Sequence, residues 1–74
     1  MTEVRSEITA NVWQVKVAPG DRLQVGDALV ILESMKMEIP VESPAAGTVS
    51  EVLVAAEQRV EEGDLLVVLD TAGS

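Results

Sequence analysis

The chain has 74 residues, a formal net charge of −8 at pH 7, and neither cysteine nor histidine. An acidic chain is a poor partner for nucleic acids and anionic membranes, because both are bound through basic patches. The missing cysteines and histidines exclude disulfides, thiolate nucleophiles and most zinc sites, and they remove the usual general base. No apolar run approaches the roughly 20 residues of a membrane-spanning helix. We therefore expect one cytoplasmic domain over residues 1–74, without a metal, catalytic residues or an enzymatic activity of its own.

The chain contains an internal repeat. Val12–Ser34 aligns without a gap with Val49–Thr71, and many of the aligned pairs are identical. Two residues at equivalent positions of the copies, such as Val12 and Val49, are called counterparts below. Each copy contains a Gly-Asp pair, beginning at Gly26 or Gly63, that is followed by an apolar run. Two copies predict a domain built from two similar halves, since a solenoid needs at least three repeats.

Short strands separated by turns are predicted along both copies. Trp13, Val15 and Val17 alternate with polar residues, which is typical of a half-buried strand. Ala28–Leu32 and Leu65–Leu69 are short apolar runs, which indicate buried strands rather than helices. The chain is therefore expected to form an all-β sandwich or flattened barrel. The residues expected in its core are Trp13, Val15, Leu29, Leu32, Val52 and Leu66.

Glycines mark several of the predicted turns. Gly26 and Gly63 occupy equivalent structural turns and are expected to have positive φ, which glycine adopts without steric cost. Gly47 is assigned to a further structural turn. Pro19–Asp21 of the first copy aligns with residues 56–58 of the second, which are Ala-Glu-Gln and lack both proline and glycine. These two turns are therefore expected to differ.

A hairpin is predicted between the two copies, over Leu32–Val41. A two-residue tip at Met35 and Lys36 pairs Leu32 with Ile39, which keeps the apolar side chains on one face. A tip one residue later would mix apolar and polar side chains on both faces, because side chains alternate along a strand. The two-residue tip is therefore the predicted register.

The predicted tip has two unfavourable features. Two-residue hairpin turns prefer Asn-Gly or a similar pair, because their central residues need positive φ, and Met35-Lys36 is a poor choice. The register also sets Glu33 opposite Glu38, a like-charge pair that weakens strand pairing. Such departures from local rules indicate a functional site. From the hairpin alone, an ordinary loop with a solvated lysine remains the alternative.

The hairpin sequence resembles the attachment signature of biotinyl domains, in which a lysine lies between two methionines at a hairpin tip. Glu33–Glu38 carries this resemblance, and Pro44–Val49 is similar to the Pro-x-x-Gly-x-Val stretch that follows it in the family. The resemblance extends over about Val12–Leu69 and includes the internal repeat. The first copy departs from the family pattern, because Thr9–Asn11 stands where a Pro-x-x-Gly stretch is common.

The resemblance implies a flattened β-barrel of two four-stranded antiparallel sheets with quasi-twofold symmetry, the biotinyl/lipoyl hammerhead fold. It implies that a biotin protein ligase attaches biotin to Lys36 through a biotinyl-adenylate. The arm then carries an activated carboxyl group between the biotin carboxylase and carboxyltransferase components of a carboxylase or decarboxylase. Met35, Met37 and Glu33 are the implied recognition residues for the ligase and the carboxylase. The chain looks most like freestanding biotin/lipoyl attachment proteins, which resemble biotin carboxyl carrier protein domains, and is expected to be monomeric alone.

Two other functions are compatible with this resemblance. A lipoyl domain shares the fold and carries an acyl group, but such domains usually have Asp-Lys-Ala at the tip, so that Met35-Lys36-Met37 favours biotin. The second alternative is an unmodified interaction module on the same scaffold. A stand-alone enzyme is the weakest hypothesis, because the sequence shows no nucleophile–base pair or metal cluster.

Overall fold

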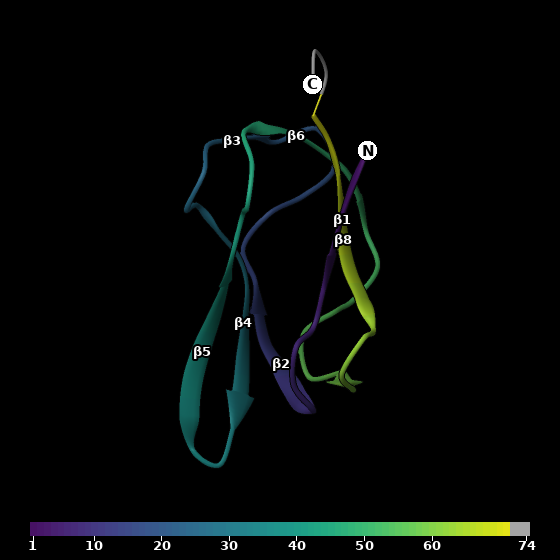
Figure 1. Ribbon diagram of the computed structural model, residues 1–74. Helices are drawn as coiled ribbons and strands as arrows, with labels where there is room; N and C mark the ends of the chain where they lie inside the picture. The colour runs from purple at the N-terminus through teal and green to yellow at the C-terminus, as the bar shows by residue number, and fades with distance from the viewer. Residues whose placement is uncertain (72–74) are drawn as a thin grey trace.

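The computed structural model describes residues 1–71, and all regular structure in this range is β-strand (Figure 1). No helix in this range is long and apolar enough to cross a membrane. The strands are β1 (Thr2–Arg5), β2 (Ala10–Val15), β3 (Arg22–Leu23), β4 (Ala28–Ser34), β5 (Met37–Glu42), β6 (Gly47–Val52), β7 (Arg59–Val60) and β8 (Leu65–Asp70).

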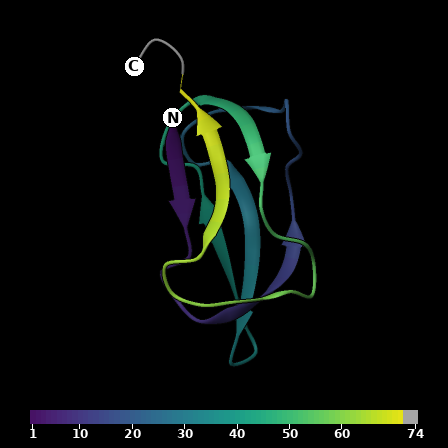
Figure 2. The same ribbon diagram turned by 90° about the vertical axis from the view of Figure 1, so that its right-hand side faces the viewer.

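The strands form two four-stranded sheets that pack against each other (Figures 1 and 2). One sheet has the order β1-β8-β6-β3 and the other has the order β5-β4-β2-β7. All neighbouring strands are antiparallel. The all-β class and the two four-stranded antiparallel sheets predicted from the sequence are therefore confirmed.

The sequence repeat is a repeat of structure. Strands β2, β3 and β4 are the counterparts of β6, β7 and β8, and each sheet contains strands from both halves. The repeat begins earlier than the sequence alignment does, at Ser6 and Ser43. Both serines are buried, and each hydroxyl donates a 2.6 Å hydrogen bond to the carbonyl two residues further on. The two halves therefore have equivalent hydrogen bonds as well as equivalent strands.

The core between the sheets consists largely of counterpart pairs. Aliphatic side chains from both sheets meet there, and their burial provides the main stabilising free energy of a domain this small. The pairs in which both members are buried are Val12/Val49, Leu23/Val60, Leu29/Leu66, Val30/Val67 and Leu32/Leu69. Leu29, Leu32 and Leu66 are thus core residues as predicted, whereas Val15 and Val52 are half-buried and pack against the core.

Trp13 does not belong to the core, and this prediction was wrong. The residue is 43% exposed. The pairing of β2 with β4 shifts register between Val12 and Gln14, so that Trp13 is the extra residue of a β-bulge. Because the bulge interrupts the alternation of faces, Val12 points into the core in place of Trp13 and is 1% exposed.

Gly47 is not a turn residue of the kind that Gly26 and Gly63 are. Gly26 and Gly63 have φ values of 92° and 90°, whereas Gly47 is the first residue of β6 and has no positive φ. Its constraint is space, because a Cβ atom at this position would lie 2.5 Å from the carbonyl oxygen of Asp70. The missing side chain therefore lets β6 approach the end of β8.

The turn at residues 56–58 has the same design as the turn at Pro19–Asp21, so the expected difference was wrong. Glu57 has a φ of 71°, close to the 96° of its counterpart Gly20. The side chain of Gln58 accepts a 3.1 Å hydrogen bond from the N–H of Ala55, as Asp21 does from Ala18 at 2.9 Å. Glu57 therefore adopts the left-handed backbone conformation that its counterpart Gly20 adopts in the first half.

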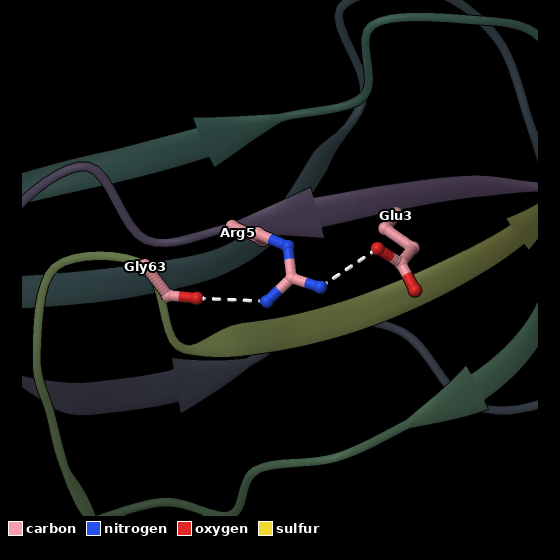
Figure 3. A network of polar contacts seen from close by, with 3 residues as sticks. All are labelled: Glu3, Arg5 and Gly63. Carbon is pink, nitrogen blue, oxygen red and sulfur yellow. Dashed lines mark hydrogen bonds and ion pairs between the residues drawn. The ribbon is translucent and has the colours of Figure 1, made fainter.

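The N-terminal strand is tied to the body by Arg5 (Figure 3). Its guanidinium donates a 2.9 Å hydrogen bond to the carbonyl of Gly63 and pairs with Glu3 at 2.7 Å. All three residues are exposed, and an exposed ion pair of this kind contributes at most about 1 kcal/mol. The ion pair lies within β1, whereas the hydrogen bond to Gly63 joins the end of β1 to the turn before β8.

Candidate functional site

The β4–β5 hairpin projects from the end of the molecule opposite the described chain ends (Figures 1 and 2). Its two strands are joined by Met35 and Lys36 alone. The register is the predicted one, with Leu32 opposite Ile39 and Ser34 opposite Met37. The buried base of β4 therefore anchors the hairpin in the core, while its tip lies in solvent.

The tip has the backbone of a two-residue hairpin turn. Met35 has a φ of 53° and Lys36 a φ of 65°, and positive φ at both central positions is the pattern of a type I′ turn. A side chain in this left-handed region costs about 1–2 kcal/mol per residue, a cost that glycine does not have. The chain therefore holds two strained residues at one point of its surface.

The side chains at the tip face solvent. Met35 is 91% and Met37 is 63% exposed, and Lys36 is also exposed. The side chain of Lys36 makes no ion pair or hydrogen bond within residues 1–71. Both methionines therefore lie outside the core. The accessible amine of Lys36 thus lies between two accessible thioethers. The hairpin fixes the backbone positions of all three residues.

Carboxylates flank the lysine on one face of the hairpin. Glu33 lies directly opposite Glu38, and both are exposed. On the other side of Glu33 is Asn11 in β2, which in turn lies opposite Arg59 in β7. These four residues form a row across the outer face of the sheet, with two negative charges at the end nearest Lys36. The structure thus places Glu33 beside the tip, as the sequence predicts.

The hairpin presents an accessible amine. Its tip is exposed to solvent, and residues 1–71 contain no group of three or more acidic side chains placed to hold a metal. Covalent attachment of a group with a carboxylic acid needs only an accessible amine on the carrier, so Lys36 fits biotin.

Lys16 is the other lysine of the chain. Its N–H donates a 2.9 Å hydrogen bond to the carbonyl of Leu29, which places it at the opposite end of β4 from the hairpin tip. The geometry therefore distinguishes the two lysines, because only Lys36 lies on a projecting turn.

The chain is similar to known proteins in both sequence and structure. The family described as "Biotin-requiring enzyme" matches residues 2–69. A Mycobacterium leprae homologue of the biotinylated protein TB7.3 is 58% identical over 48 residues, which are 65% of this chain and 68% of that protein. A single-chain, multi-domain long-chain acyl-CoA carboxylase superposes with a TM-score of 0.90 and 32% identity, over 99% of this chain and 7% of its own. The Kluyveromyces lactis urea carboxylase gives a TM-score of 0.87 and 35% identity, over 93% of this chain and 6% of its own.

Proposed function

The chain belongs to the family of biotin-requiring enzymes as a biotin carrier, and we propose that Lys36 is the residue to which its biotin is attached. The observation that supports this residue is its position. The β4–β5 hairpin is the one that projects from the described part of the chain (Figures 1 and 2). Lys36 lies in its two-residue tip, and its side chain is unpaired. A carrier needs this arrangement, because its attachment point must enter the active sites of other proteins.

Attachment would form an amide at the Nζ atom of Lys36. The amine, after losing a proton to a base of the ligase, attacks the acyl carbon of biotinyl-adenylate, and AMP leaves as the C–N bond forms. Once attached, biotin supplies the carboxyl-carrying chemistry. The chain itself contributes the rigid hairpin that holds the attachment point away from the body. Tethering then makes transfer between sites a local event at high effective concentration.

The other residues of the hairpin would serve recognition. Met35 and Met37 are exposed apolar groups on either side of Lys36, and exposed methionines suit contacts with more than one partner. Glu33 adds a charge three positions before the lysine. The proposed partners are a biotin protein ligase and the biotin carboxylase and carboxyltransferase components of a carboxylase, with the chain itself a monomer. A cytoplasmic location is part of the proposal and rests on the cysteine-free sequence.

Intact-mass measurement tests the attachment site. Protein purified from its own host should contain one biotin per chain, and this mass should be lost in Lys36→Arg but kept in Lys16→Arg. Biotin retained by Lys36→Arg would contradict the proposal. A lipoyl group on Lys36 would instead show an acyl carrier, and an unmodified chain from cells with an active ligase would show an interaction module.

A further inference from the structure

The internal repeat provides a comparison for every residue near the hairpin. What the fold requires at a position should be the same in both halves, because counterparts have equivalent strands and hydrogen bonds. Two exposed positions beside the Lys36 hairpin differ sharply from their counterparts. Trp13 corresponds to Ser50, and Glu57 corresponds to Gly20. In both pairs, the residue beside the hairpin has the larger side chain.

Trp13 is not needed for the fold. The pairing of β6 with β8 has a bulge at the equivalent place, between Val49 and Glu51, and the extra residue there is Ser50. A small polar side chain is therefore sufficient at this bulge. Trp13 is the one aromatic residue of the chain, and 43% of it remains exposed. Tryptophan is enriched among the residues that contribute most of the binding energy in protein interfaces.

Glu57 has a backbone conformation that favours glycine. The same turn in the first half uses Gly20, so the fold can be built there without strain. A non-glycine residue at this φ costs about 1–2 kcal/mol, and such strain is found mainly at functional sites. A binding role for the Glu57 carboxylate accounts for this backbone strain.

Trp13 and Glu57 line a single surface hollow. The hollow is completed by Asn11, Val12 and Glu33. Glu33 is three residues from Lys36, about 10 Å along a strand at roughly 3.3 Å per residue. A stable protein interface covers about 800 Å² on each partner, a disc of about 16 Å radius. A protein that binds the hairpin tip would therefore reach this hollow.

The charges at the hollow indicate which chemical groups can bind there. Glu33 and Glu57 line it and Glu38 lies beside Glu33, whereas Arg59 is the one basic residue in the same row across the sheet. An indole face next to carboxylates attracts a guanidinium or ammonium group through cation–π and ionic contacts. The charge of the whole chain, −8, draws the same kind of partner.

We propose that this hollow is a docking site for the biotin ligase, which places a basic side chain between the Trp13 ring and the carboxylates of Glu57 and Glu33. The proposal rests on biotin attachment at Lys36. The ligase is favoured over the carboxylase because it acts on the bare lysine, whose short side chain brings the two proteins into close contact. A biotinylated lysine is longer and can reach an active site while the body stays further away.

Steady-state biotinylation of the full chain by the ligase of its own host tests the proposal. Trp13→Ser, which installs the counterpart residue, should raise the KM for the carrier about 5- to 30-fold and leave kcat within about twofold, because a docking contact contributes to binding and not to the chemical step. Glu57→Gln should raise KM about two- to fivefold, an effect that fades at high salt. Thermal unfolding of each variant should show an intact fold.

Matched controls come from β6, in the sheet that does not carry the hairpin. Moving the tryptophan, in Trp13→Ser with Ser50→Trp, should not restore KM, and Glu51→Gln should leave KM unchanged. Normal ligase kinetics in Trp13→Ser and Glu57→Gln would overturn the docking site but not the attachment at Lys36. The docking site is also overturned if these variants are biotinylated normally but accept the carboxyl group slowly. A wild-type chain that takes up no biotin would overturn both proposals.

Discussion

Glu33 and Glu38 lie directly opposite each other on the two strands that carry Lys36. Both are exposed, and like charges in directly opposed positions weaken strand pairing by roughly 0.2–1 kcal/mol. The strained φ values of Met35 and Lys36 lie two residues away. The hairpin therefore concentrates unfavourable interactions at the place where the chain is most accessible. The fold does not need them, since the hairpin is anchored by the buried base of β4 and by Ile39 and Val41 of β5, which pack against the core.

Removing one charge of this pair should stabilise the chain. In Glu38→Gln, the free energy of unfolding should rise by a few tenths to about 1 kcal/mol at low ionic strength, and the gain should shrink in high salt as the repulsion is screened. Urea denaturation at two salt concentrations measures both. Glu42→Gln is the matched control, because Glu42 lies opposite Ala28. An equal gain in the control would attribute the effect to net charge rather than to the pair.

The hairpin could be predicted from the sequence because two independent signals agree there. Side chains alternate with a period of two, so the apolar residues Leu32 and Ile39 can share a face in only one register. Once Leu32 is paired with Ile39, the number of residues between them sets the turn length at two. Neither signal depends on the rest of the fold. The role of Lys36 in attachment, in contrast, rests on family resemblance, because an exposed lysine has no physical signature of its own.

Bulges and strained turns are harder to predict, since an extra residue in a strand leaves no mark in its hydrophobic pattern. Trp13 looked like a core residue because Val15 and Val17 continue the alternation. The repeat pointed to an exposed position. The counterpart of Trp13 is Ser50, and a small polar side chain is unfavourable in an aliphatic core. Similarly, the alignment of Glu57 with Gly20 indicates a left-handed backbone only if the two turns are assumed to be alike.

Truncating the core leucines should strongly destabilise the chain. Leu32 and Leu66 are 1% and 0% exposed, so Leu32→Ala or Leu66→Ala should lower the free energy of unfolding by about 2–5 kcal/mol. That is a large share of the stability of a small domain. Trp13→Ala should cost less than about 1 kcal/mol despite the larger side chain removed, because Trp13 packs on the outside. Calorimetric unfolding of the three variants gives this ranking, and a larger loss for Trp13→Ala than for Leu66→Ala would contradict the burial pattern.

Substitutions of Met35 separate recognition from folding. Met35→Ala should leave the melting temperature nearly unchanged, because the side chain is 91% exposed and alanine is as strained as methionine at a φ of 53°. If the thioether is a contact for the ligase or the carboxylase, the same variant should slow biotinylation or carboxyl transfer. The two measurements, melting temperature and ligase kinetics, should therefore diverge.

Met35→Asn makes the test more stringent, because asparagine tolerates the left-handed region and is favoured at the first position of a type I′ turn. This variant should melt at a higher temperature than the wild type and still be a poorer substrate, so that stability and modification change in opposite directions. A general loosening of the hairpin cannot produce that combination. Strong destabilisation of Met35→Ala with normal modification would instead give Met35 a structural role. Biotinylation at the wild-type rate in both variants would leave Lys36 as the attachment residue without help from Met35.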